Sequence, residues 1–186
     1  MSITEKQKAY HLQKMRTRMT RLDINKDGYI SRDDYELMSK KLSEHSGMTK
    51  KQAESVYEEF MRVADSLNLK PGLKIPLKEA AQNASKVILS MEPKERKTKL
   101  HANHGMLFDA IDTNKDGHIS QEEFKMYFQV IAPDISEAEV AHSFETIDAN
   151  KNGEISREEF VTAAEDFMCG VEETDLSKVF FGHLLD

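Results

Sequence analysis

The sequence lacks tryptophan and has few structure-breaking or cross-linking residues: one cysteine, four prolines and eight glycines among 186 residues. The single cysteine, Cys169, cannot form an intramolecular disulfide, which fits the reducing cytosol. No apolar run reaches the roughly 18 residues of a membrane span. The first residues have no hydrophobic signal core, so we expect a cytoplasmic protein. The net charge of −7 argues against nucleic acid and anionic membranes as partners.

Between these few breakers, hydrophobic residues recur at three- and four-residue steps, which is typical of amphipathic helices. Patterns typical of strands are nearly absent. We therefore predict an all-α protein with eight helices and a short further helix around 175–181. The spacing is clearest on one face of the first predicted helix, at Leu12, Met15, Met19 and Leu22.

Cap residues predict where several of these helices begin. Ser2, Thr49 and Ser136 are each followed three residues later by Glu or Gln, which is the pattern of a capping box. Pro76 and Pro93 stand where a first helical turn would begin, because proline fits that position without losing a hydrogen bond.

The strongest signal is a twelve-residue repeat at 23–34, 112–123 and 148–159, each copy lying between two helical patterns. Every copy has Asp or Asn at positions 1, 3 and 5, Gly at position 6, Ile at position 8, Ser at position 9 and an acid at position 12. Three matches in register are not plausibly chance. This is the pattern of the calcium-binding EF-hand, a helix–loop–helix unit.

Calcium prefers about seven hard oxygen ligands, and positions 1, 3, 5, 7, 9 and 12 of the loop supply them, position 7 through its backbone carbonyl. Position 6 must turn sharply with positive φ, which favours glycine. The predicted ligands are Asp23, Asn25, Asp27, Tyr29, Ser31 and Asp34 in the first site; Asp112, Asn114, Asp116, His118, Ser120 and Glu123 in the second; and Asp148, Asn150, Asn152, Glu154, Ser156 and Glu159 in the third.

Position 12 distinguishes these sites. Glu123 and Glu159 can bind an ion through both carboxylate oxygens, whereas Asp34 is one methylene shorter. Unless its helix shifts inward, Asp34 should bind through one oxygen, which suits Mg²⁺ or weakens Ca²⁺ binding. We predict three Ca²⁺ sites, the first being the least typical.

EF-hands work in pairs, and the first loop needs a partner before residue 112. The candidate is 68–79, in which Lys70, Gly72 and Leu73 replace two ligands and the turn glycine. This loop should not bind calcium, but Ile75 should still pair with Ile30. We expect an N-terminal pair at 1–91, a C-terminal pair at 92–171 and an apolar tail at 172–186 that packs on the body.

The chain resembles the sarcoplasmic calcium-binding protein superfamily, which includes the calcium-regulated photoproteins. Within it, the chain is most similar to the anthozoan luciferin-binding proteins, also called coelenterazine-binding proteins. Beside the loops, the resemblance rests on 9–15, 28–37, 60–65, 172–174 and 181–185. It implies a compact globule whose four EF-hands enclose an apolar cavity for the luciferin coelenterazine, which Ca²⁺ makes available to a luciferase.

The sequence departs from the photoproteins, which hold a peroxidised luciferin with histidine, tryptophan and tyrosine and end in proline. It has no tryptophan, it ends Leu185–Asp186, and Met15, Ala164 and Met168 stand at the positions that align with the photoproteins' His and Trp groups. The resemblance therefore implies luciferin binding without light emission by the protein itself.

The expected luciferin pocket lies among Met- and Phe-rich helix faces. Arg18 and Tyr35 are candidates to meet a polar group of an aromatic ligand. The residues that we expect to line the pocket are Met15, Arg18, Met19, Tyr35, Phe180 and His183. His101 and His104 are three apart, and we interpret them as surface histidines rather than a metal pair. The sequence contains none of the serine-hydrolase, zinc-protease or phosphate-loop motifs, so we expect a binding protein rather than an enzyme.

Two other functions share every loop residue. One is a cytosolic buffer for Ca²⁺ and Mg²⁺, which Asp34 favours. The other is a calmodulin-like sensor that binds a partner helix. The apolar tail argues against the sensor, because it can already fill the groove. We expect a monomer in each case.

Overall fold

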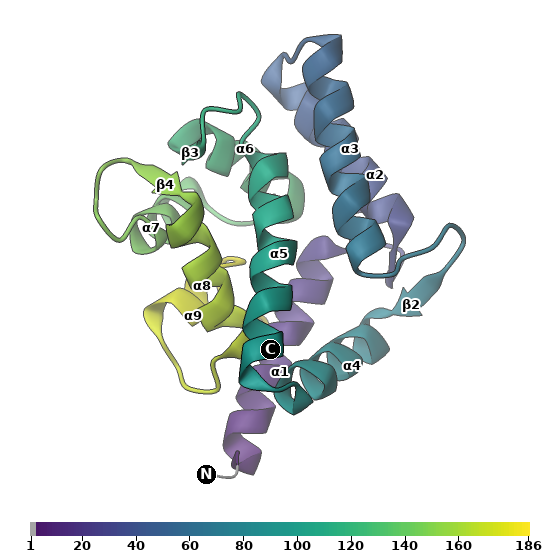
Figure 1. The fold of residues 1–186 in the computed structure, drawn as a ribbon, viewed down its shortest axis with the longest axis vertical. Helices are drawn as coiled ribbons and strands as arrows, with labels where there is room; N and C mark the ends of the chain where they lie inside the picture. Colours follow the sequence, from purple (N-terminus) through teal and green to yellow (C-terminus); the bar gives the residue numbers. More distant parts are fainter. Residues whose placement is uncertain (1–2) are drawn as a thin grey trace.

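The computed structural model describes residues 3–186, which fold into four helix–loop–helix units followed by a short helical tail (Figure 1). Ser2 of the expected first cap lies outside the described residues, and Thr4 caps the first helix instead. The elements are α1 (Glu5–Leu22), β1 (Tyr29–Ser31), α2 (Arg32–Ser46), α3 (Lys50–Ser66), β2 (Lys74–Pro76), α4 (Leu77–Ser90), α5 (Pro93–Ile111), β3 (His118–Ser120), α6 (Gln121–Ile131), α7 (Glu137–Ile147), β4 (Glu154–Ser156), α8 (Arg157–Cys169) and α9 (Asp175–Val179).

Most helix starts follow the predicted caps. Thr49 and Ser136 each accept the backbone N–H three residues on, and Pro93 is the first residue of α5. Pro76 differs from the prediction, because it ends strand β2 and precedes the first residue of α4. Its extended backbone, with ψ of 138°, belongs to the strand rather than to a helical turn.

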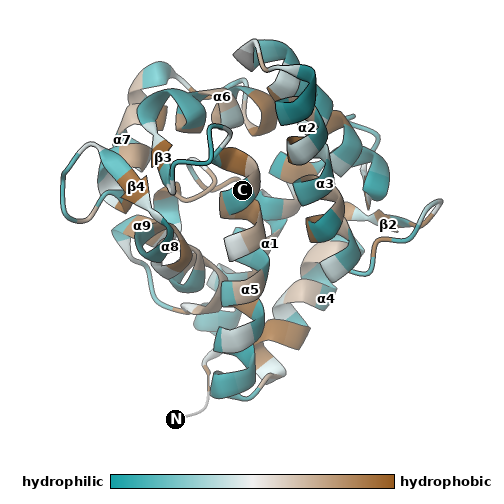
Figure 2. Ribbon diagram, turned by 45° about the horizontal axis from the view of Figure 1, so that its top comes forward, coloured by the Kyte–Doolittle hydropathy of each residue, from teal (hydrophilic) through white to brown (hydrophobic). Residues whose placement is uncertain are grey.

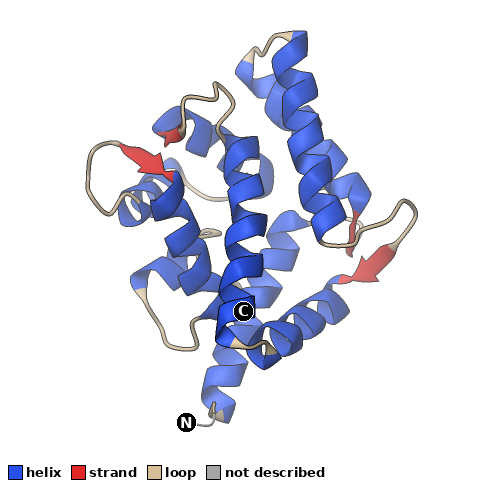
Figure 3. Cartoon of the chain, in the orientation of Figure 1, coloured by secondary structure: helices blue, strands red, loops and turns tan. Residues whose placement is uncertain are grey.

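Two short antiparallel ladders join the loops in pairs, and both were expected from the sequence. β1 pairs with β2 so that Ile30 faces Ile75, and β3 pairs with β4 so that Ile119 faces Ile155. The strands are only three residues long, so helices still dominate the described fold (Figure 3). The loop at 68–79 has therefore kept the pairing role of an EF-hand.

One hydrophobic core runs through both pairs of hands. α3 packs on α5, α2 on α6, and α1 on α8 and α4. Hydrophobic residues gather on the inward helix faces, and hydrophilic residues cover much of the outside (Figure 2). The division into 1–91, 92–171 and 172–186 follows the helix–loop–helix units but stays a prediction, since the core is continuous across it. Within residues 3–186, no helix is both long enough and apolar enough to cross a membrane.

The tail packs on the body, as its apolar sequence predicts. Phe180 and Phe181 are 4% and 1% exposed, and their rings lie 5.7 and 5.1 Å from the ring of Phe167 on α8. Leu185 N–H donates to Thr17 Oγ1 at 2.9 Å, which holds the end of the tail against α1. The tail therefore seals one side of the core.

Candidate metal centres and an internal cavity

The three complete loops fold as twelve-residue turns around their first carboxylate. In the first loop, Asp23 accepts the N–H groups of Asp27 and Gly28, each at 3.1 Å. Gly28 has a φ of +83°, and the glycines at position 6 of the other two loops have φ of +87° and +88°. The turn therefore needs the glycine that the sequence provides, because side chains rarely adopt this backbone conformation.

The other two complete loops repeat these contacts. Asp112 accepts the Gly117 N–H at 3.0 Å, and Asp148 accepts the Gly153 N–H at 2.9 Å. The residues at position 3 also accept the N–H two residues on, at 3.0 Å in each loop. Since these contacts fix the oxygens of positions 1 and 3 inside the turn, the three loops share one ligand arrangement.

At position 12 of each loop, a carboxylate accepts hydrogen bonds from backbone N–H groups at positions 2, 3 or 9. Glu123 accepts the N–H groups of Thr113 and Ser120, each at 2.9 Å. Asp34 makes the equivalent contacts, to Ile24 N–H at 2.9 Å and Ser31 N–H at 2.8 Å. The backbone before the two helices differs, because Ser31 has a φ of −147° and Ser120 a φ of −73°.

Several of these carboxylates are buried next to one another. Asp34 is fully buried, and its burial raises the pKa of its carboxyl, which the neighbouring Asp23 raises further. Burial likewise raises the pKa of Asp112, beside Glu123 and Asp116. Buried carboxylates are normally paired with a cation or bound to a metal. A divalent cation would neutralise them, so the donor sets fit hard cations such as Ca²⁺ and Mg²⁺.

The third loop differs, because its position-5 residue is Asn152 rather than an acid. Burial by itself raises the pKa of Glu159, but N–H groups of Ser156 and Asn150 outweigh it and lower that pKa. Within residues 3–186, no three Asp, Glu, His or Cys side chains gather closely enough to hold a metal by themselves. Each loop therefore depends on amide, hydroxyl and backbone oxygens as well.

The partner loop at 68–79 has lost this ligand arrangement. Positive φ angles occur at Asn68, position 1, and at Gly72, position 5, with 58° and 80°, whereas Leu73 stands at position 6. Lys70 replaces the oxygen ligand at position 3. The loop keeps its ladder with β1 but offers no ring of oxygens.

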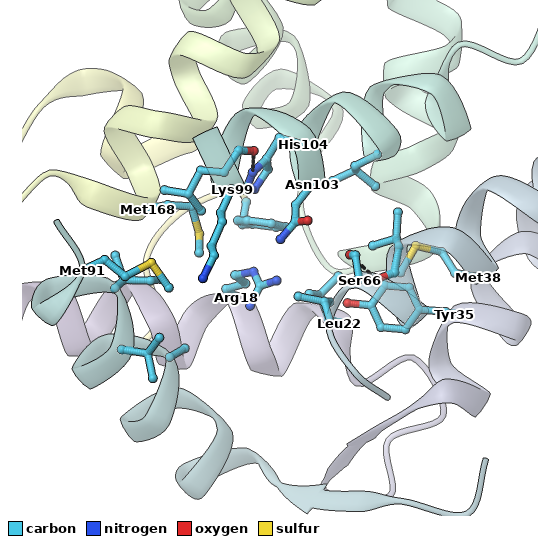
Figure 4. A pocket seen from close by; sticks show the side chains of 18 residues that line it. Arg18, Leu22, Tyr35, Met38, Ser66, Met91, Lys99, Asn103, His104 and Met168 are labelled. Atoms are coloured by element: carbon cyan, nitrogen blue, oxygen red, sulfur yellow. Dashed lines mark hydrogen bonds between the residues drawn. The ribbon is translucent and has the colours of Figure 1, made fainter. Parts of the chain in front are cut away.

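A cavity of about 420 Å³ lies between the two pairs of hands (Figure 4). Ligand pockets in proteins typically span roughly 300–1,000 Å³. The wall is mainly apolar, with polar groups from α1, α2 and α5. Its lining residues are Arg18, Leu22, Tyr35, Met38, Val63, Ser66, Leu67, Ala84, Val87, Ile88, Met91, Lys99, Leu100, Asn103, His104, Leu107, Met168 and Phe181.

Two of the six predicted pocket residues, Arg18 and Tyr35, line this cavity. Met15 and Met19 are buried but lie outside its wall, because they face the packed core instead. Phe180 is one residue away from the wall and packs among Phe160, Phe167 and Phe181.

His183 lies on the surface, where its Nδ1 is 2.9 Å from Glu139 Oε1. Its side chain is 52% exposed, and it is not part of the cavity wall. The residue follows Gly182, whose φ of +78° turns the chain away from the buried Phe181.

Sequence reasoning missed four polar residues of the wall, Ser66, Lys99, Asn103 and His104, of which His104 is the most buried. It is 5% exposed rather than on the surface, and burial lowers its pKa to about 4. Its Nδ1–H donates to the Leu100 carbonyl at 2.9 Å, which leaves Nε2 as an acceptor. His101, by contrast, is half-buried and its Nε2 lies 2.8 Å from Glu165 Oε2. The sequence spacing could have placed His104 on the inner face of its helix, four residues after Leu100 and four before Phe108.

Arg18 projects from α1 toward the centre of the cavity (Figure 4). Within the described part of the chain, its buried Nε has no hydrogen-bond partner, and neither has the buried Tyr127 hydroxyl. Burial raises the pKa of Tyr35, and the positive charge of Arg18 opposes this shift. Burial also raises the pKa of Tyr127, and Tyr35 raises it further. Tyr127 does not line the cavity. Because an unpaired buried donor is costly, the Arg18 end of the cavity suits a ligand with a hydrogen-bond acceptor.

Comparison with known proteins identifies the class first. Residues 103–165 match the family model of the EF-hand domain pair, and residues 16–39 match that of a single EF hand. The fold and the loops therefore define an EF-hand protein.

The chain is 44% identical over 183 residues to the luciferin-binding protein of Renilla reniformis, covering 98% of this chain and 99% of the relative. It is 36% identical over 178 residues to a sarcoplasmic calcium-binding protein of Perinereis vancaurica tetradentata, covering 94% and 98%. The chain thus belongs to the luciferin-binding protein family, within the sarcoplasmic calcium-binding protein superfamily.

Solved structures agree. The calcium-loaded apo form of the coelenterazine-binding protein of Renilla muelleri superposes with a TM-score of 0.93 at 44% identity, covering 98% of this chain and 100% of the other. n-Aequorin superposes with a TM-score of 0.70 at 18% identity over 97% and 96%, which shows a shared fold.

Proposed function

We propose that the protein binds coelenterazine in the internal cavity and releases it when Ca²⁺ fills the three complete loops. The observation that carries this proposal is the partly buried Arg18 side chain, which is aimed into an apolar cavity and whose buried Nε is unpaired within the described residues. Coelenterazine combines aromatic rings with a carbonyl oxygen that such a donor can bind. The names of the Renilla relatives support the same ligand.

The polar groups of the cavity can bind both hydrogen-bond acceptors and hydrogen-bond donors of the ligand. Arg18 and the Tyr35 hydroxyl donate hydrogen bonds, whereas Nε2 of neutral His104 accepts one from a phenol or ring N–H. Met38 and Met168 supply flexible apolar walls, which adapt to an irregular ring system. These residues bind and orient the ligand, and the packed tail beside Phe181 excludes water. We infer a binding protein rather than an enzyme.

The mouth of the cavity lies where its lining becomes exposed, between α4 and the start of α5. Val87 on α4 is 48% exposed, and the side chain of Lys99 on α5 is 56% exposed. α4 is tied to the first loop, because Leu77 N–H donates to the Gly28 carbonyl at 3.1 Å and Ile75 faces Ile30. We propose that Ca²⁺ at the first loop moves α4 through this ladder and opens the mouth.

Thermodynamic linkage makes the proposal reciprocal. If Ca²⁺ weakens coelenterazine binding, coelenterazine must weaken Ca²⁺ binding by the same factor. In the calcium-free state the ligand is sequestered from water, and on Ca²⁺ binding it becomes available to a luciferase. The carrier is proposed to act as a cytoplasmic monomer with three Ca²⁺ sites, the first of which also accepts Mg²⁺.

The test mixes calcium-free protein with coelenterazine and looks for a shifted visible absorbance and 1:1 co-elution, followed by release on adding Ca²⁺. Arg18→Gln should weaken ligand binding at least tenfold, since a buried charged hydrogen bond contributes about 1.5–3 kcal/mol. Arg16→Gln is the matched control, because Arg16 is exposed on the same helix. Absence of a complex with the wild-type protein would refute the carrier function.

A buffer for Ca²⁺ and Mg²⁺ is the second candidate function. Asp34 at position 12 and the sarcoplasmic calcium-binding relative favour it. A buffer would bind the cations without retaining coelenterazine. The sensor alternative would instead bind an amphipathic peptide only with Ca²⁺, and the tail that buries Phe180 and Phe181 argues against it.

A further inference from the structure

The loop that cannot bind calcium contacts the loop that can. Lys74 on β2 places its Nζ 2.6 Å from Oδ2 of Asp27, the position-5 ligand of the first site. The same ammonium lies 5.8 Å from the centre of the Tyr29 ring. Asp33 and Asp34 also act on it electrostatically. A positive charge of the protein itself is therefore held beside the first site.

The C-terminal pair carries the opposite charge at the equivalent place. Lys74 faces Ser31 across the first ladder, and Glu154 faces Ser120 across the second. Both are the seventh residue of their loops. Glu154 extends toward the neighbouring loop, with its Oε2 3.9 Å from His118 Nδ1. The 112–123 loop thus faces a carboxylate, whereas the 23–34 loop faces an ammonium.

We propose that Lys74 lowers the affinity of the first loop for divalent cations. The loop at 68–79, which is not expected to bind calcium, would thus control the affinity of the loop with which it pairs. This inference rests only on the calcium-binding part of the proposed function. An incoming Ca²⁺ is repelled by the ammonium, which also competes for the charge of Asp27. Because Lys74 is about half exposed, solvent screens the repulsion, and we expect an effect of roughly three- to tenfold in affinity.

The electrostatic origin has a specific consequence for ion selectivity. Ca²⁺ and Mg²⁺ carry the same charge, so the repulsion weakens both by a similar factor. Lys74 should therefore set how tightly the first site binds, while ligand geometry, including the short Asp34, sets which ion it prefers.

The experiment titrates Ca²⁺ in chelator-buffered solutions and follows the backbone amide resonances of Gly28, Gly117 and Gly153, one in each complete loop. Lys74→Met should lower the Gly28 midpoint three- to tenfold and leave the other two glycines unchanged. Lys74→Glu should lower it further. The difference from wild type should shrink at high salt.

Lys70→Met is the matched control. It removes the same charge from the same loop, and within residues 3–186 Lys70 forms no side-chain ion pair. Its Gly28 midpoint should change less than twofold. A shift as large as that of Lys74→Met would mean that general charge, not the contact with Asp27, controls the site, and would overturn the proposal.

The converse variant, Glu154→Lys, should raise the Gly117 midpoint. A normal Gly28 response with an unchanged midpoint in Lys74→Met would overturn the role of Lys74 and leave the calcium site standing. No Gly28 response to Ca²⁺ in wild type or variants would overturn both the role of Lys74 and the first calcium site. A changed preference between Ca²⁺ and Mg²⁺ in Lys74→Met would contradict the electrostatic origin.

Discussion

Two buried histidines should make the calcium-free protein sensitive to mild acid. His11 and His104 are 0% and 5% exposed, and burial lowers the pKa of each from 6.5 to about 4. His11 lies with Nε2 2.7 Å from the Met168 carbonyl oxygen and Nδ1 2.9 Å from Ser85 Oγ. Since the carbonyl can only accept, Nε2 carries a proton; this contact raises the pKa of His11, but burial outweighs it and favours the neutral ring.

Nearby positive charges act in the same direction as burial. Lys14 and Arg96 further lower the pKa of His11, and Arg18 and His101 further lower that of His104. The hydrogen bonds to the Met168 and Leu100 carbonyls raise the two pKa values but do not outweigh burial. Protonation of each histidine therefore has to occur against its surroundings or through unfolding.

The magnitude follows from linkage. Between pH 6.5 and 4 the unfolded chain binds more protons than the folded one, so this stability is complete above about 6.5 and falls as the pH drops toward 4. A shift of about 2.5 units at 1.36 kcal/mol per unit is on the order of 3 kcal/mol for each histidine. The raised pKa values of Asp34 and Asp112 offset part of the loss, because those carboxyls stabilise the folded state at low pH.

Urea unfolding followed by circular dichroism in EDTA, from pH 7.5 to 4.5, measures this loss. His104→Gln and His11→Gln should each flatten the pH dependence, whereas His142→Gln, at an exposed position, should not. Imidazole resonances of the wild-type protein give a second readout that needs no variant. Titration of both buried rings near pH 6.5 would refute the reasoning.

Three further results are expected. Glu123→Gln should reduce the bound Ca²⁺ measured by calorimetry by one ion per protein, and Glu122→Gln should not, because Glu122 is exposed and does not occupy a ligand position of the loop; an unchanged count in Glu123→Gln would contradict the assignment. Phe180→Ala should lower the free energy of unfolding in urea by about 3–5 kcal/mol, since it empties a fully packed ring site, and a loss below about 1 kcal/mol would contradict that packing. Ile30→Ala should cost about 2–5 kcal/mol and weaken Ca²⁺ binding at Gly28 more than at Gly153, and equal weakening would disprove the local coupling.

Much of the fold could be predicted because it depends on local, periodic signals. The geometry of a bound ion requires the turn glycines and the loop acids. The antiparallel pairing of two loops places Ile30 opposite Ile75. The silent loop was recognised because Lys70 cannot bind a cation. These features need no knowledge of how distant helices pack.

The cavity could be predicted only in part, because its wall forms where several helices pack together in the tertiary structure. Arg18 and Tyr35 were expected, but Met15 and Met19 lie a fraction of a helical turn away and face the packed core. His104 was assigned to the surface because a pair of histidines three residues apart on a helix is more often exposed than metal-binding. Helical spacing places a residue on a face, but the packing of α1 against α4 and α8 decides whether that face meets a void.

The cavity wall joins segments that lie far apart in sequence, from Arg18 on α1 to Phe181 after α9. Neither an N-terminal nor a C-terminal fragment contains enough of the wall to enclose a ligand. If the cavity binds coelenterazine as proposed, fragments 1–91 and 92–186 produced separately, which hold one ladder each, should retain the ligand only after the two reassociate. Retention of the ligand would then report that the two halves of the chain have associated.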